Sequence, residues 1–289
     1  FSGDAPAPVL CLTATAKPEV VRDIRDHFQT RLGVDLMLLD GGAVRTNLSF
    51  AVLPTQKATK LTDILSAIEA NLPPEGASGA VVYCATRGAT EKVAEFLKGQ
   101  GLAADYFHAG LPPDRKHDVQ EAFRTGQLRV IAATNAFGMG IDKPDIRWVA
   151  HADLPKSIEG YYQEIGRAGR DGAPAETLTL YGPDDIRLRR TQIDEGLAPP
   201  DRKAADHARL NALLGLAEAM ACRRQVLLGY FGEAAEPCGN CDLCDRPALL
   251  FDATDAVRKA LSAILRTGEW FGAGHLIDIL TGNATAKVR

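Results

Sequence analysis

The sequence predicts an α/β protein with a mostly parallel sheet, followed by a helical segment that carries a cysteine cluster. Between residues 48 and 181, short apolar runs bounded by glycine or proline alternate with longer segments of helical periodicity. This alternation is typical of strand–helix–strand units that build a parallel sheet. Four of the six cysteines then fall between residues 222 and 244, after the alternation has ended. The two observations divide the chain into a sheet-containing part and a part held by cysteine chemistry.

Composition restricts the class of protein only slightly. The chain has 289 residues, enough for two or three domains, with 46% hydrophobic and 24% charged residues. Its formal net charge is -4, so a nucleic-acid site would have to be a local basic strip. No apolar run approaches membrane-spanning length and no signal peptide is visible, so we expect no membrane partner and a cytoplasmic location. Because Phe1 stands in place of methionine, we also expect a preceding region.

The first predicted elements are a strand over residues 8–15, PVLCLTAT, and a helix from Pro18 to about Phe28. Proline is favoured in the first turn of a helix, where its missing N–H is not needed. Residues 39–47, LDGGAVRTN, are rich in glycine and lack periodicity, as in a connection between domains. We place a domain boundary there.

The next segment supplies the predicted sheet. The strands are predicted at 48–53, 80–84, 104–107, 130–133, 148–150 and 176–181, and the helices among them at 57–71, 90–100 and 113–125. Crossovers should be right-handed, which places the functional loops at the carboxyl ends of the strands. Later helices are predicted after Gly182 and at 202–220, 222–229, 255–265 and 275–280.

Residues 129–172 contain the strongest candidates for a nucleotide site. After the strand at 130–133 comes a loop with Gly138 and Gly140, whose backbone amides could approach a phosphate or sugar closely. After the strand at 148–150, Ser157 is a candidate N-cap for a helix that runs toward Arg167 and Arg170. The two arginines share one face if the helical turn persists, and two guanidiniums suit the oxygens of a phosphoryl group. Either pattern alone fits a tight turn or a solvated pair, but their order around a strand favours a nucleotide site.

The segments TNAFGMGIDKP (134–144) and YYQEIGRAGRDG (161–172) resemble motifs V and VI of the superfamily-two helicases, specifically the RecQ family of DNA helicases. The resemblance implies a RecA-like motor lobe over residues 46–195. It also implies that Arg167 and Arg170 are catalytic, one of them as an arginine finger that reaches the ATP site. The nucleotide-binding residues that it implies are Gly138, Gly140, Asp142, Gln163, Arg167 and Arg170.

Three further segments resemble motifs of the same family. Residues 13–16, TATA, stand where motif III lies, VYCATR (82–87) resembles motif IV, and HAGL (108–111) resembles the block that follows it. DNA contacts are therefore expected at Thr13, Thr15, Arg87, His108 and Thr134. Such contacts would follow a strand without reading its sequence. The alternatives are that TATA is a polar strand end and that His108 is a structural, hydrogen-bonded histidine.

The cysteine cluster is the clearest signal from residue spacing alone. Cys222, Cys238, Cys241 and Cys244 give the pattern C-x15-C-x2-C-x2-C. Four thiolates suit a closed tetrahedral zinc site, which stabilises a fold and leaves no open position for catalysis. Disulfides and an iron–sulfur cluster are the alternatives. The remaining thiols, Cys11 and Cys84, fall in predicted strands and are expected in the core.

The resemblance extends over most of the chain. The segments CRRQVLLGYFGE and PCGNCDLC resemble the zinc-binding subdomain of RecQ helicases, which we place at 200–248. Residues 252–289 resemble the start of the winged-helix domain that follows it. Residues 1–40 correspond to the end of the first motor lobe.

The 289 residues contain neither GxxxxGK[ST] nor a strand-terminal DExH box. They therefore lack the phosphate cradle and magnesium ligands of a P-loop ATPase, and we expect the segment alone to be inactive. The resemblance implies that the full-length protein is an ATP-dependent 3′–5′ DNA helicase of recombination and repair, nucleoid-associated if bacterial. Zinc would be structural, and ATP and Mg²⁺ would bind only with the first lobe. The expected partners are single-stranded DNA, duplex junctions, ATP and single-stranded DNA-binding protein.

Two other functions remain open from the sequence. One is a non-catalytic, zinc-stabilised DNA-binding or adaptor module derived from a helicase, which an upstream Walker A lysine and DExH box would exclude. The other is an RNA helicase of the DEAD-box type, which shares the GRAGR pattern. That type usually has a histidine–arginine pair where this chain has Gln163 and Glu164, and it has no cysteine cluster at this place.

Overall fold

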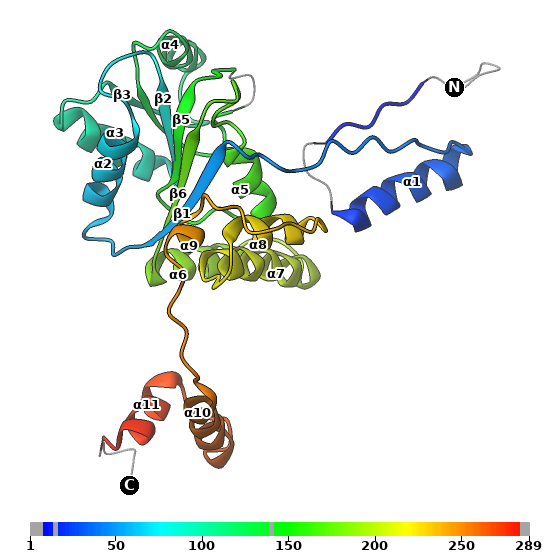
Figure 1. Ribbon diagram of the computed structural model, residues 1–289, viewed down its shortest axis with the longest axis vertical. Helices are drawn as coiled ribbons and strands as arrows, with labels where there is room; N and C mark the ends of the chain where they lie inside the picture. Colours follow the sequence, from blue (N-terminus) through cyan, green and yellow to red (C-terminus); the bar gives the residue numbers. More distant parts are fainter. Residues whose placement is uncertain (1–7, 14–16, 139–141, 284–289) are drawn as a thin grey trace. The chain divides into compact units, whose positions relative to one another are not determined.

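Six parallel strands form the central sheet of the protein (Figure 1). The computed structural model describes residues 8–13, 17–138 and 142–283. The strand order is β1-β6-β5-β2-β4-β3, and every paired strand runs parallel to its neighbour. The strands are β1 Leu48–Pro54, β2 Gly79–Tyr83, β3 Ala104–Phe107, β4 Val130–Ala133, β5 Ile146–His151 and β6 Ala175–Tyr181. The predicted parallel α/β sheet is confirmed.

Helices cover both faces of this sheet. On one face, α2 (Lys60–Asn71) and α3 (Arg87–Gly99) bury their apolar side chains against the strands. The other face packs against α4 (Pro113–Arg124), α5 (Ile158–Ile165), α7 (Pro200–Ala217) and α8 (Arg223–Tyr230). Figure 1 shows α2 and α3 on the side of the sheet opposite to α5. Because both faces are covered, β2 and β4 are buried along their whole length, which explains their uninterrupted apolar sequences.

The helical, cysteine-containing segment shares its core with the sheet. Leu210 and Leu213 of α7 and Leu227 of α8 belong to the same buried cluster as Val81 of β2 and Val149 of β5. One compact unit therefore extends as far as Pro247 and includes α6 (Pro183–Asp194) and α9 (Asp242–Asp245). A second unit begins at Ala248 and contains α10 (Thr254–Arg266) and α11 (Ala273–Thr281).

The predicted strand at residues 8–15 is wrong for the part that can be described. Residues 8–13 have no regular structure, and Leu10, Cys11 and Leu12 are exposed. An apolar run becomes a strand only where neighbouring strands accept its backbone hydrogen bonds, and the sheet from β1 to β3 does not include this segment. The predicted helix is confirmed as α1 (Pro18–Leu32), with proline at its start. Of the two expected core thiols, only Cys84 is buried.

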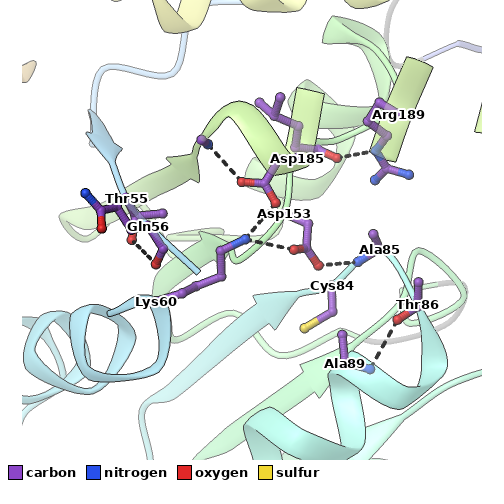
Figure 2. Close-up of polar contacts among 12 residues, drawn as sticks. Thr55, Gln56, Lys60, Cys84, Ala85, Thr86, Ala89, Asp153, Asp185 and Arg189 are labelled. Atoms are coloured by element: carbon purple, nitrogen blue, oxygen red, sulfur yellow. Dashed lines mark hydrogen bonds and ion pairs between the residues drawn. The ribbon is translucent and has the colours of Figure 1, made fainter. Parts of the chain in front are cut away.

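One lysine connects three strand ends at the carboxyl edge of the sheet (Figure 2). Lys60 Nζ lies 3.0 Å from Asp153 Oδ1 and 2.7 Å from Asp185 Oδ1. The other oxygen of Asp153 accepts a hydrogen bond from the Ala85 amide, and that of Asp185 accepts one from the Gly182 amide, at 2.8 and 2.9 Å. The cluster therefore fixes the segments that leave β2, β5 and β6.

Charge attraction dominates over desolvation at this lysine. Burial lowers the pKa of Lys60, but the attraction and hydrogen bonds of Asp153 and Asp185 outweigh it, so the pKa lies above its ordinary value of 10.5. A raised lysine pKa contributes stability that is fully present below the unfolded pKa and is lost only as the pH rises through the folded one. Burial also raises the pKa of Asp153, but Lys60 and the Ala85 amide bring it below its ordinary value.

Replacing this lysine should destabilise the fold. Lys60→Met leaves two mostly buried carboxylates beside each other, so we expect the free energy of unfolding to fall by about 2–4 kcal/mol at pH 7. The loss should shrink toward pH 4, because a carboxyl whose folded pKa is raised becomes stabilising when it is protonated. Denaturant unfolding at both pH values measures this. The exposed Lys57 provides the control, and Lys57→Met should change stability by no more than about 0.5 kcal/mol. An equal loss at both pH values would contradict the interpretation.

Candidate functional site

The two candidate catalytic arginines lie in a turn that follows α5. Ser157 caps the helix, as predicted, and accepts a hydrogen bond from the Gly160 amide at 3.2 Å. The helix ends at Ile165, and residues 166–172, here called the arginine turn, continue as turns and bends. Gly169 has a φ of +54°, which a side chain would disfavour. The expectation that the helix runs on to Arg167 and Arg170 is therefore wrong, and both arginines project from turns that follow it.

Arg167 is held against the loop that follows β4. Its Nη1 donates to the Gly138 carbonyl at 2.7 Å. A Cβ on Gly138 would lie 2.1 Å from the Arg167 guanidinium carbon, and the φ of Gly138 is +140°, so only glycine allows this approach. The neighbouring Tyr83 hydroxyl donates to the Phe137 carbonyl at 3.3 Å. Gly140, the other glycine of the predicted contact, lies outside the described residues.

Two ion pairs, made by Arg170 and Asp171, hold the end of the arginine turn. Arg170 Nη1 lies 3.1 Å from Asp142 Oδ1 in an exposed pair. Arg147 Nη2 lies 2.5 Å from the carboxylate of Asp171. The predicted nucleotide-binding residue Asp142 thus contacts Arg170 directly.

A cavity of about 460 Å³ brings most of the predicted nucleotide residues together. Gly138, Gln163, Arg167 and Arg170 all line it. Two residues that sequence reasoning missed, Arg45 and Arg224, also line it. Among the described residues that line this cavity are four arginines and no carboxylate, so its charge suits a polyanion such as a nucleoside triphosphate. We call it the arginine cavity.

A second cavity, of about 600 Å³, lies at the carboxyl ends of β2, β4 and β5. Thr86 and Ser157, the N-caps of α3 and α5, both line it, so two helix amino termini meet there. Helix amino termini attract anions through their free N–H groups and dipole. Arg87 and Thr134, two of the predicted DNA contacts, line the same groove. We call it the strand-end groove.

The other predicted DNA contacts are placed differently. His108 is 6% exposed, with Nε2 at 3.1 Å from Glu91 Oε1 and its ring stacked on Tyr106. Its side chain therefore has the structural partners that the alternative interpretation required, and its contact with DNA stays a prediction. Thr13 lines neither cavity, and Thr15 lies outside the described residues.

A buried histidine was not anticipated. His151, at the end of β5, is fully buried, with Nε2 at 2.9 Å from Glu164 Oε2 and its ring stacked on Tyr83. Glu164 lines the strand-end groove, and Gln163 and Arg167 line both cavities. The arginine turn and the groove are therefore parts of one connected arrangement around α5.

The four predicted metal ligands come together. The four Sγ atoms all lie within 4.8 Å of one another. The Sγ atoms of Cys238 and Cys244 are 3.9 Å apart, and those of Cys222 and Cys241 are 4.0 Å apart. A tetrahedron of sulfurs around zinc has edges of about 3.8 Å, given Zn–S bonds of about 2.3 Å. Burial raises the pKa of Cys222, but amides of Gln225 and Cys238 donate to its sulfur and bring the pKa down to about 7. Burial raises the pKa of Cys238 to about 12 and also raises that of Cys241 above its ordinary value. The assignment as metal ligands therefore rests on the spacing of the four sulfurs, and no disulfide joins the described cysteines.

Residues 238–245, here called the cysteine knuckle, cover the outer edge of β1. Cys241 pairs with Phe50 as an isolated parallel bridge, and the Val52 amide donates to Asp242 Oδ2 at 3.0 Å. Arg223 donates to both carboxylate oxygens of Asp242, at 2.6 and 2.8 Å. An edge strand otherwise exposes unpaired backbone groups, so the knuckle completes the sheet.

Comparison with known families agrees with this arrangement. Residues 57–172 match the helicase conserved C-terminal domain, residues 183–245 match the RecQ zinc-binding family, and residues 247–289 match the RQC domain. The chain belongs to the RecQ family of DNA helicases. The four cysteines are therefore the cluster of a RecQ zinc-binding domain.

RecQ relatives align along nearly the whole chain. The ATP-dependent DNA helicase RecQ of Haemophilus influenzae is 38% identical over 98% of this chain and 44% of its own length. The Bacillus subtilis protein of the same name is 36% identical over 97% of this chain and 46% of its own length. The RecQ-like DNA helicase BLM of Xenopus laevis is 39% identical over 98% of this chain and 22% of its own length. The chain thus spans less than half the length of these relatives.

Every helix of the described residues is too short or too polar to cross a bilayer.

Zinc removal should affect more than the knuckle. We expect one zinc per chain and a loss of zinc in Cys241→Ser. A zinc-binding subdomain with a core of its own would leave the sheet folded after chelation, but Cys222 and Cys241 belong to the same core as Val81 and Val149. Chelation should therefore lower the melting temperature of the whole unit that ends at Pro247, in one transition. Metal analysis and calorimetry measure both effects.

The exposed Cys11 is the matched control for the cysteine substitution. Cys11→Ser should keep both the zinc content and the melting temperature of the parent. Less than half an equivalent of zinc in the parent protein would contradict the assignment, as would a sheet that melts unchanged after chelation.

Proposed function

We propose that this chain supplies the second motor lobe of an ATP-dependent 3′–5′ DNA helicase of recombination and repair. The observation that carries the proposal is that Arg167 and Arg170 line one cavity together with two further arginines, and that no carboxylate is among the described residues that line it. The proposed domains are the end of a first lobe (1–40), the second lobe (46–195), the zinc-binding subdomain (200–248) and the start of a winged helix (252–289). Zinc would have a structural role, because four thiolates leave no open coordination position.

The arginines would act on the transferring phosphoryl group. In phosphoryl transfer, negative charge on the oxygens is stabilised by positioned cations, and a planar guanidinium can donate two parallel hydrogen bonds to such oxygens. Gln163 and the Gly138 segment would contact the nucleotide beside them. The phosphate cradle and Mg²⁺ ligands would come from a separate lobe, because the 289 residues contain no Walker A or DExH sequence.

The strand-end groove would hold the backbone of a DNA strand. Arg87, Thr134 and the amino termini of α3 and α5 offer positive charge and N–H or O–H donors to phosphates. None of these groups reads a base edge, so binding would be independent of sequence. Since Gln163 and Arg167 line both cavities, α5 would connect DNA contact with nucleotide contact.

The missing nucleotide motifs favour one other candidate, a DNA-binding or adaptor module without catalysis. The arginine substitution below separates it from the helicase. Association with single-stranded DNA-binding protein and a cytoplasmic or nucleoid location stay predictions.

The arginine test uses this chain joined to a lobe that carries Walker A and DExH motifs. The isolated chain should show no ATP turnover, whereas the joined protein should be a DNA-stimulated ATPase. Arg170→Ala should then lower kcat by roughly 10² to 10⁵ with a much smaller effect on nucleotide binding, because the interaction forms mainly in the transition state. Arg170→Lys should not rescue turnover, since lysine lacks the planar fork.

Arg124 is the matched control for Arg170. It is exposed on α4 and forms an ion pair with Glu121, one helical turn away, at 2.6 Å. Arg124→Ala should leave turnover within about twofold. Full DNA-stimulated turnover in Arg170→Ala would exclude the proposed catalytic role.

The DNA proposal can be tested on the isolated chain. Arg87→Ala should weaken the binding of single-stranded oligonucleotides of different sequence to a similar degree. The slope of log K against log salt should become shallower by about 1, as expected when one phosphate contact is lost. Titrations at several salt concentrations measure this, with Arg124→Ala as the control. An unchanged slope in Arg87→Ala would remove the groove from the DNA path.

A further inference from the structure

Arg45 holds the arginine turn from a distant part of the sequence. It lies in the connection before β1, yet its Nη2 donates to the carbonyls of Ala168 and Gly169 at 2.8 and 2.9 Å. Its Nη1 also approaches the Gly166 carbonyl at 3.4 Å. Asn47 adds a 2.8 Å hydrogen bond to the Gly169 carbonyl. These carbonyls flank Arg167 on both sides and directly precede Arg170, so the contacts fix the peptide units from which both arginines project.

The turn needs this external support. Residues 166–172 lie beyond the last regular turn of α5, so their carbonyls are not satisfied by a continuing helix. The fit around Gly169 is tight, because a Cβ there would lie 2.5 Å from Asn47 Nδ2. A small displacement of the turn would therefore move both guanidiniums in the arginine cavity.

Arg224 extends the contact to the helical subdomain. It stands near the start of α8, is 7% exposed, and its guanidinium lies over the Phe50 ring at 5.3 Å. Its Nη2 donates to the Leu48 carbonyl at 2.6 Å and to the Arg45 carbonyl at 3.2 Å. The backbone of Arg45 is therefore held from α8, while its side chain holds the arginine turn.

We propose that Arg45 is a positioning residue for Arg167 and Arg170, and that Arg224 makes this positioning depend on the helical subdomain. Neither residue needs to touch the reacting phosphoryl group. The expected effect on ATP turnover rests on the proposed function, whereas the effect on the turn itself does not.

The first experiment measures the turn in the 289-residue chain by amide hydrogen exchange. The Gly169 amide donates to the Ile146 carbonyl and the Gly172 amide to the Gly169 carbonyl, at 2.9 and 3.0 Å, so both should be protected. In Arg45→Met we expect these amides to exchange at least about tenfold faster, because the carbonyl contacts that hold the turn are lost. Unchanged protection would overturn the proposal.

Arg129, the residue before β4, provides a matched control. Its guanidinium also donates to three carbonyls, those of Ser78, Pro74 and Pro73, at 3.1, 2.8 and 2.6 Å. Arg129→Met removes the same kind of contact without touching the arginine turn. It should leave exchange at Gly169 and Gly172 unchanged, and faster exchange there would show a general loss of stability and overturn the proposal.

The second experiment measures turnover in the protein that includes the nucleotide-binding lobe. Arg45→Met should lower kcat by about 10- to 100-fold with the KM for ATP within about twofold, because it misplaces the arginines without removing them. Arg45→Lys should recover part of kcat. Arg224→Met should lower kcat less, and the double variant should be no worse than Arg45→Met, since both act along one path.

The two experiments fail in different ways. If the unsubstituted joined protein has no DNA-stimulated turnover, the proposed function fails and the exchange measurement alone decides the role of Arg45. If that protein is active and Arg45→Met keeps its kcat, or loses no more than Arg129→Met, the positioning role is overturned.

Discussion

Burial of a parallel sheet on both faces is the constraint on which the rest of this structure depends. Parallel strands place all their carboxyl ends at one edge, so loops from distant parts of the sequence meet there. Polar groups at that edge must be paired, because an unpaired charge beside an apolar core is costly. Lys60 between Asp153 and Asp185 meets this requirement, and the same edge carries the strand-end groove. Stability and ligand contact therefore use neighbouring residues of one edge.

The outer edge of the sheet explains why the cysteine knuckle is part of the fold. Among the strands of the described residues β1 pairs with β6 alone, and the residues around Cys241 and Asp242 cover its other side. Beside the knuckle, α8 contacts the backbone of β1 through Arg224. The cysteine-containing segment, which the sequence separates from the sheet, thus packs against the sheet and shares its hydrophobic core. Cys222 stands two residues before Arg224, which donates to the Arg45 carbonyl, and the Arg45 side chain donates to the arginine turn.

The sequence predicted those features that depend on near neighbours. Short apolar runs gave the strands β1 to β6, and the cysteine spacing gave the metal cluster, because both signals lie within a few residues. The prediction of a strand around Leu10 was wrong because apolar composition does not show whether a partner strand exists. The extent of α5 was overestimated because the glycines at 166 and 169 end the helix. Arg45 and Arg224 could not be found, since their contacts join residues more than 120 positions apart.

The partners of the cavity arginines fit a site for a polyanion. Arg45, Arg167 and Arg224 are held by backbone carbonyls, which fix a guanidinium through hydrogen bonds but do not cancel its charge. A carboxylate at these positions would neutralise the arginines and compete with a phosphate. The carboxylate that does approach, Asp142, meets Arg170 in an exposed pair, where solvent weakens the attraction. The arrangement thus holds the guanidinium groups in place while leaving their positive charge available to a polyanion.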